Sequence, residues 1–202
     1  MNTACICSGW QWESDNPFIM HIHEGKLSGI RLITPDVHCD TRGFFLESFS
    51  AREFEAVGIP CNFVQDNHSL SVETGVVRGL HFQTPPFEQS KLVRVVCGAI
   101  FDVVVDCRAD STTFGQWEGF KLSEDNYAIL YIPAGFAHGL CTLMPNTEVL
   151  YKVDNYYSKS HDSGIRWNDP AIGIQWPVTQ PILSDKDNAL PFLHEMISPF
   201  RM

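Results

Sequence analysis

Three segments of the sequence place side chains of catalytic type within strand-like apolar runs. The first is Val77–Gln83, which reads Val-Arg-Gly-Leu-His-Phe-Gln and contains His81. Side chains alternate between the two faces of a strand, so the pattern predicts Arg78 on one face and His81 on the other. An imidazole titrates near neutral pH and suits acid–base chemistry. Taken alone, His81 fits a hydrogen-bonded structural histidine equally well.

A further strand-like run, at 91–96, lies between the first and second of these segments and contains a lysine. Alternation puts Lys91 on the same face as Val93 and Val95. A lysine among β-branched neighbours is either an edge or snorkelling surface residue or a cation turned into a site. The pattern leaves both interpretations open.

The other two segments contain an imidazole and a group of tyrosines. Residues 132–139 contain Pro-x-Gly-x-x-His, a turn followed by a strand that aims His138 inward. In the run at 148–153, Tyr151 lies on the opposite face from Leu150 and Lys152, and Tyr157 follows shortly after. Ordinary rim packing also explains the tyrosines, because a buried tyrosine needs only one hydrogen-bond partner.

Short runs rich in Val, Ile, Phe and Tyr must position these side chains. We expect strands at 29–34, 44–49, 76–83, 91–96, 100–107, 117–122, 128–132 and 148–153. Gly, Pro, Asn and Asp separate the runs, and this spacing predicts an all-β sandwich or barrel. Residues 51–57 read as a helix, and residues 187–197 are a candidate for a short C-terminal helix.

Composition and charge limit the classes of protein to consider. The chain has 202 residues, of which 44% are hydrophobic and 19% charged, so it can bury a core and is not disordered throughout. We expect one β domain at 28–202 and an N-terminal extension of uncertain order at 1–27. The net charge of −10 argues against nucleic-acid binding and against an anionic membrane surface, but not against a small phosphorylated ligand. No apolar stretch approaches the roughly 18 residues of a membrane span.

The cysteines indicate a reducing compartment. There are 7, an odd and scattered set, and several lie inside apolar runs. Buried free thiols explain this better than a disulfide framework. The first 20 residues lack the basic and apolar regions of a secretory signal, so we expect a cytoplasmic protein. The pair Cys5-x-Cys7 is a weak metal-like signal that we interpret as incidental.

Six blocks occur in an order that one family shares. They are Arg-Gly-Leu-His-Phe-Gln (78–83), Lys-Leu-Val-Arg-Val-Val (91–96), Phe-Asp-Val-Val-Val-Asp-Cys-Arg (101–108), Thr-Phe-Gly-Gln-Trp (113–117), Ile-Pro-Ala-Gly-Phe-Ala-His-Gly (132–139) and Gly-Ile-Arg-Trp-Asn-Asp-Pro-Ala-Ile-Gly-Ile-Gln-Trp-Pro (164–177). Together they resemble the dTDP-4-dehydrorhamnose 3,5-epimerases from about residue 29 to 187. The resemblance implies a cupin-like jelly-roll barrel with short peripheral helices that forms a homodimer and needs no metal or organic cofactor.

The resemblance also implies a reaction and its catalytic residues. The family converts dTDP-4-dehydro-6-deoxy-D-glucose into dTDP-4-dehydro-L-rhamnose for rhamnose biosynthesis. His81 matches the general base, and Asp187 the carboxylate that orients it. Lys91 matches the cation beside the substrate carbonyl, and Tyr151 the general acid on the other face of the sugar. These types suit the chemistry, because a ketone at C4 acidifies the protons on C3 and C5 and the enolate needs a positive group at its oxygen.

Further polar residues match the substrate contacts of the family. They are Gln65, Asn67, Arg78, His138, Asp162 and Lys186, together with Tyr157, which matches the ring that stacks on thymine. Arg42 and Glu47 match nucleotide contacts that, in this family, reach over from the partner subunit. Asp162 stands where a glutamate is usual. Local cations explain how an acidic protein binds a diphosphate.

Three alternatives stay open at this stage. One is a relative that inverts only C3 or only C5 of another nucleotide-linked ketosugar. Another is a sugar-nucleotide-binding barrel without catalysis, which would need neither a base nor an acid. The third is a metal-dependent cupin oxygenase, whose first motif carries His-x-His. This sequence reads His81-Phe82-Gln83 there, and His21-Ile22-His23 lies outside the barrel pattern, so we predict no metal site.

Overall fold

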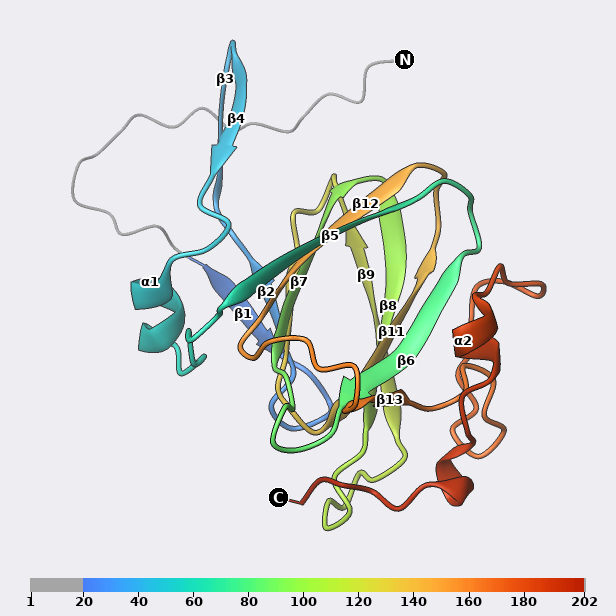
Figure 1. The fold of residues 1–202 in the computed structure, drawn as a ribbon. Helices are drawn as coiled ribbons and strands as arrows, with labels where there is room; N and C mark the ends of the chain where they lie inside the picture. The colour runs from blue at the N-terminus through green and yellow to red at the C-terminus, as the bar shows by residue number, and fades with distance from the viewer. Residues whose placement is uncertain (1–19, 202) are drawn as a thin grey trace.

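The computed structural model describes residues 20–201, and antiparallel β-strands make up most of its regular structure (Figure 1). One sheet has the order β1 (His21–Glu24), β2 (Arg31–Thr34), β10 (Ile129–Ile132), β7 (Lys91–Cys97), β12 (Thr147–Val153) and β5 (Gln65–Ser71). The second has the order β13 (Asp162–Gly164), β6 (Val77–Gln83), β11 (Phe136–Thr142), β8 (Ala99–Asp106) and β9 (Trp117–Ser123). Each predicted strand overlaps an observed one, which confirms the all-β prediction.

The remaining elements lie outside the two sheets. Strands β3 (Val37–Asp40) and β4 (Gly43–Leu46) form a hairpin that projects away from the barrel in Figure 1. The predicted helix at 51–57 is confirmed as α1 (Ala51–Ala56). The C-terminal helix candidate at 187–197 is wrong: α2 spans Asp185–Asn188, and only a 3-10 turn, Leu193–Glu195, follows. Pro191 explains the break, because proline disfavours helical backbone in the residue before it.

The core lies between the two sheets and follows from strand alternation. Val93 and Val95 of β7 and Leu130 of β10 pack there against Ile100 and Val104 of β8. A second apolar cluster, which includes Leu80 and Phe200, packs the C-terminal segments against the five-stranded sheet. A third lies beneath α1. Facing antiparallel sheets with an apolar interior are the layered arrangement of a jelly roll.

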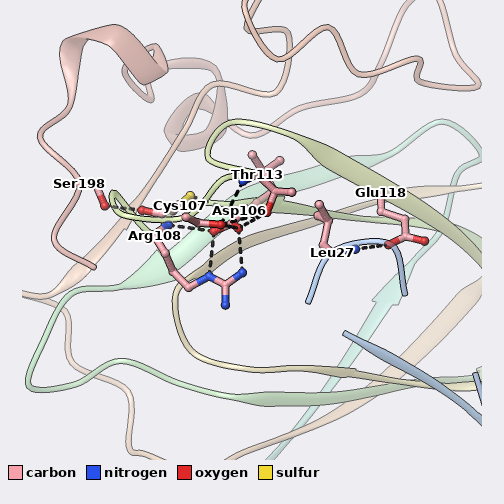
Figure 2. Close-up of polar contacts among 9 residues, drawn as sticks. Leu27, Asp106, Cys107, Arg108, Thr113, Glu118 and Ser198 are labelled. Carbon is pink, nitrogen blue, oxygen red and sulfur yellow. Dashed lines mark hydrogen bonds and ion pairs between the residues drawn. The ribbon is translucent and has the colours of Figure 1, made fainter. Parts of the chain in front are cut away.

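Two acidic residues, the buried Asp106 and the half-buried Glu118, fix loops at one end of the barrel (Figure 2). Asp106, at the end of β8, accepts hydrogen bonds from the Arg108 guanidinium and from the hydroxyls of Ser111 and Thr113. Burial alone would raise its pKa, but these hydrogen bonds lower it to about 2. Glu118 of β9 accepts a backbone hydrogen bond from Leu27 and so ties down the chain after β1.

The predicted N-terminal extension is described in part. Residues 20–27 include β1, which pairs with β2 at one edge of the six-stranded sheet. Residues 1–19, with the Cys5-x-Cys7 pair, lie outside the described part. The cysteines within residues 20–201 are free thiols, as predicted: Cys39, Cys61, Cys97, Cys107 and Cys141. No helix in this part of the chain is long and apolar enough to cross a membrane.

Candidate active site

A cavity of about 580 Å³ is lined by strands of both sheets and by α2. Most of the predicted site residues line it: Arg78, His81, Lys91, His138, Tyr151, Tyr157, Asp162, Lys186 and Asp187. They come from positions more than 100 residues apart in the chain. The structure therefore brings together side chains that only the family resemblance had linked.

An irregularity in β6 turns both Arg78 and His81 to the cavity. His81 pairs with His138 of β11, whereas Arg78 pairs with Leu140, so three steps along β6 match two along β11. Strict alternation placed Arg78 and His81 on opposite faces, and that prediction is wrong because the register shifts between them. Gly79 permits the shift: its φ is +119°, and a Cβ there would lie 2.6 Å from the β11 backbone.

His81 forms a pair with a buried carboxylate. Its Nε2 lies 2.6 Å from Oδ1 of Asp187, whose side chain is 5% exposed. Burial alone would raise the pKa of Asp187, but hydrogen bonds from His81, Ser184 and the Gly79 backbone lower it. The carboxylate is therefore ionised at neutral pH and accepts a hydrogen bond from the N–H at Nε2. This fixes the tautomer and leaves Nδ1 able to take up a proton.

Lys91 contributes a buried cation beside this pair. It begins β7, on the same face as Val93 and Val95 as predicted, and its Nζ donates to the backbone oxygen of His81 at 3.3 Å. Burial lowers its pKa to about 8, an effect opposed by the charges of Asp102 and Asp162. Most of the amine is thus protonated at neutral pH.

His138 binds a second buried carboxylate, which the sequence did not single out. Both oxygens of Asp102 lie 2.9 Å from its Nε2, and Asp102 is fully buried. Burial lowers the pKa of His138, although Asp102 opposes this effect. Asp102 had a visible signal, since it is an acid within the otherwise apolar run of β8.

Tyr151 stands on the opposite wall from His81. It belongs to β12 of the six-stranded sheet, whereas His81 belongs to β6 of the five-stranded sheet. It lines the cavity, while the neighbouring Lys152 reaches Asp66 instead, so the predicted alternation holds. Burial raises the pKa of Tyr151 and keeps its hydroxyl protonated. The cavity thus has a potential proton acceptor on one wall and a potential donor on the other.

Several predicted binding residues meet at the rim of the cavity. Asp162 Oδ2 accepts hydrogen bonds from Tyr157 Oη at 3.0 Å and from Lys186 Nζ at 2.5 Å. Gln65 donates to Asn67 at 2.9 Å and accepts from the Tyr157 backbone at 3.3 Å. These contacts join β5, β13, α2 and the loop after β12 into one rim.

Four predicted site residues do not line the cavity: Gln65 and Asn67, which lie beside Tyr157, and Arg42 and Glu47, which lie elsewhere. Arg42 is in the turn of the β3–β4 hairpin, and Glu47 directly follows β4. Neither lines the cavity. Arg42 instead pairs with Asp40 of the same hairpin, with Nε 3.0 Å from Oδ2.

Fold and cavity together define a cupin-like barrel equipped for proton transfer. An oriented imidazole, a buried ammonium and a protonated phenol share one enclosed site, the set of groups needed to form an enolate and reprotonate it. Within residues 20–201, no three His, Cys, Asp or Glu side chains are grouped so as to hold a metal ion.

Comparisons with known proteins identify the family. The model for dTDP-4-dehydrorhamnose 3,5-epimerase matches residues 24–195. The enzyme of that name from Shigella flexneri is 51% identical over 169 residues, which is 83% of this chain and 93% of the relative. The chain belongs to the dTDP-4-dehydrorhamnose 3,5-epimerase family and is an isomerase. The resemblance seen in the sequence is confirmed.

Solved structures agree with this assignment. The Bacillus anthracis epimerase, with TDP and PPi bound, has a TM-score of 0.85 and 53% identity, and the match covers 86% of this chain and 99% of that one. A Legionella pneumophila dTDP-6-deoxy-D-glucose-3,5-epimerase in complex with dTDP-4-keto-L-rhamnose has a TM-score of 0.87 and 41% identity, covering 91% and 99%. The cupin-like barrel is therefore confirmed.

Proposed function

We propose that this enzyme inverts C3 and C5 of dTDP-4-dehydro-6-deoxy-D-glucose and so forms dTDP-4-dehydro-L-rhamnose for rhamnose biosynthesis. The observation that carries the proposal is the placement of the His81–Asp187 pair and Tyr151 on facing walls of one cavity. Family membership supports the same reaction, since relatives named for it are about half identical to this chain.

Proton removal is the role of His81. Its Nδ1 takes the proton from C3 or C5, which the neighbouring C4 ketone acidifies, and Asp187 stabilises the imidazolium that results. Negative charge then develops on the C4 oxygen. The Lys91 ammonium stabilises this enolate oxygen, and burial strengthens the interaction because little water screens it.

Proton return from the other face completes each inversion. The Tyr151 hydroxyl gives its proton to the carbon, and the configuration changes because donor and acceptor stand on opposite sides of the sugar ring. The raised pKa of Tyr151 keeps the proton available before this step. After each inversion, His81 releases its proton to solvent and Tyr151 takes one up from solvent, so the same pair can act on the second carbon.

The rim residues suit the nucleotide part of the substrate. We assign Arg78 and Lys186 to the diphosphate, Tyr157 to stacking on thymine, and Gln65, Asn67, His138 and Asp162 to further contacts. Arg78 is held ready, because it donates to Ser71 Oγ at 3.2 Å and to the Leu70 backbone oxygen at 3.3 Å. An ordered guanidinium loses less freedom when it binds phosphate.

A homodimer would supply the missing contacts. Arg42 lies on the β3–β4 hairpin that projects from the barrel (Figure 1), and Glu47 directly follows it; we expect both to reach a second copy. Apolar side chains on the hairpin and near the β5 edge also face solvent: Phe44 is 58%, Leu70 52% and Val72 58% exposed. Exposed apolar groups of this kind favour association. We therefore propose that each hairpin completes the site of its partner.

The remaining assignments are simpler. We propose a single jelly-roll domain at 28–202 after the N-terminal extension at 1–27, whose residues 20–27 join the six-stranded sheet through β1. The reaction should need no metal or organic cofactor, because acid–base groups account for every step. Free thiols at the described cysteines suit a cytoplasmic enzyme.

Incubation with dTDP-4-dehydro-6-deoxy-D-glucose in deuterated water tests the proposal. We expect one deuteron at C3 and one at C5 of the inverted product, read by NMR. Deuterium uptake and inversion at only one carbon would contradict the proposal and support an enzyme that inverts C3 or C5 alone. Tight binding without label or inversion would replace it with the non-catalytic barrel.

A further inference from the structure

The rim aspartate Asp162 has more protein contacts than a residue reserved for the ligand would need. Its side chain is 14% exposed, whereas Lys186, which it binds at 2.5 Å, is 51% exposed. The same oxygen also accepts the Tyr157 hydroxyl. A largely buried carboxylate with two donors forms a firmer anchor than an exposed ion pair.

Lys186 precedes Asp187 in α2, a helix of 4 residues. A helix of one turn is not stable by itself, so contacts with the rest of the protein must set its orientation. Hydrogen bonds fix the flanking chain on both sides. The Ile182 N–H donates to the Gly75 oxygen before the helix, and after it the Arg166 backbone N–H donates to the Pro191 oxygen and the Arg166 guanidinium to the Leu190 oxygen. Between these points, side-chain bonds tie the helix to the sheet: Lys186 donates to Asp162, and Asp187 accepts from His81 and from the Gly79 backbone.

Strand pairing closes a ring through these contacts. In the β13–β6 ladder, Asp162 pairs with Gln83 and Gly164 pairs with His81. The path therefore runs from His81 across the ladder to Asp162, on to Lys186 and Asp187, and back to His81. Because α2 is held on both sides, Asp187 has little freedom to turn away from the imidazole.

We propose that Asp162 is a positioning residue for proton removal: by holding Lys186, it keeps α2 oriented so that Asp187 stays in contact with His81. The proposal rests on the proposed function, in which His81 is the base. A residue that only touches the nucleotide would affect substrate binding. A residue that positions the base affects the rate at saturating substrate.

The first test separates kcat from KM. We expect Asp162→Asn to lower kcat about tenfold, because small displacements of a catalytic group are costly, and also to raise KM through Tyr157 and Lys186. Asp162→Glu keeps the charge on a longer arm and should recover part of kcat. Asp110→Asn is the matched control, since it removes a surface ion pair with Arg201 away from the cavity and should change neither constant.

The second test asks whether the effect passes through Asp187. In an Asp187→Asn background, the further change Asp162→Asn should leave kcat unchanged, because the contact it supports is already lost. Circular dichroism and thermal unfolding establish that each variant is folded. The substrate is dTDP-4-dehydro-6-deoxy-D-glucose throughout, with deuterium uptake as the readout.

The outcomes distinguish this inference from the proposed function. If Asp162→Asn raises KM with kcat at the wild-type value, or lowers kcat equally in both backgrounds, Asp162 is not a positioning residue for Asp187. If wild-type protein neither exchanges nor inverts this substrate, the proposed function itself fails, and the inference fails with it.

Discussion

His81 and His138 are direct partners in the β6–β11 ladder, yet each imidazole binds a different buried carboxylate. His81 Nε2 lies 2.6 Å from Asp187 of α2, and His138 Nε2 lies 2.9 Å from both oxygens of Asp102 of β8. Both rings are therefore held in a defined tautomer within one cavity. In our account, the His81 pair removes the proton and the His138 pair helps to hold the substrate.

The buried amine of Lys91 predicts a limit at alkaline pH. Its pKa is lowered to about 8, so the ammonium predominates below that pH and the neutral amine above it. Only the ammonium stabilises the enolate, and kcat/KM, which reports the free enzyme, should therefore fall as the pH rises through about 8. A profile of kcat/KM from pH 6 to 10 checks this expectation.

Two variants establish whether Lys91 causes that fall. Lys91→Arg keeps a charge that does not titrate in this range, so its activity, although lower, should stay level to higher pH. Lys91→Met should be weak at every pH. If the activity of Lys91→Arg falls at the same alkaline pH as that of the wild type, another group causes the fall.

A mixed-subunit experiment tests whether sites are shared. A chain with Arg42→Ala and a chain with His81→Asn should each be weakly active alone. In a mixed dimer, one site then receives an intact Arg42 and an intact His81, so random pairing should restore about a quarter of wild-type activity. Light scattering should give twice the mass of 22.8 kDa. Activity no greater than the sum of the two parents would rule out sharing.

The anchor around Asp106 predicts a large loss of stability. Asp106→Asn leaves the 15%-exposed Arg108 without its charged partner, which should cost about 3–5 kcal/mol of unfolding free energy in urea. Asp110→Asn, which alters an exposed pair, should change it by less than about 0.5 kcal/mol. Equal stability in the two variants would refute this role of Asp106.

Acid should weaken the same anchor. The folded pKa of Asp106 is about 2, below its unfolded value, so its ionisation stabilises the fold above the unfolded pKa. This contribution, about 2 kcal/mol, is lost as the pH falls from about 4 through about 2. Between about pH 4 and 2, the unfolding free energy should thus fall less steeply in Asp106→Asn than in wild type.

Chelation tests the predicted independence from metal. The sequence lacks the second imidazole of a His-x-His motif at His81-Phe82-Gln83. Protein dialysed against a strong chelator should keep its full activity, with metal content measured alongside. Stoichiometric metal whose removal abolishes activity would contradict the acid–base account.

The sequence predicted local features better than long-range ones. Alternation correctly placed Lys91 on the face of Val93 and Val95 and Tyr151 on the face opposite Leu150 and Lys152, because a regular strand has a fixed period of two. It failed for Arg78, where the shifted register of β6 breaks that period. The helix candidate at 187–197 failed at Pro191 for an equally local reason.

Contacts across the chain had no local signal. Asp187 lies 106 residues from His81, and only the family resemblance linked the two. Asp102 was visible as an acid in an apolar run, but nothing local linked it to its partner, His138, on another strand. The shared use of Asp162 by Tyr157 and Lys186 likewise depends on β13 and α2 meeting at the rim.

The most direct measurement compares His81→Asn with Tyr151→Phe by NMR in deuterated water. His81→Asn removes the base, so exchange at C3 and C5 and inversion should both fall by about 10²–10⁴. Tyr151→Phe keeps the base but lacks the donor hydroxyl. It should still exchange protons for deuterium with retained configuration, while inversion drops steeply. Inversion by Tyr151→Phe at the wild-type rate, or exchange by His81→Asn at the wild-type rate, would contradict the account.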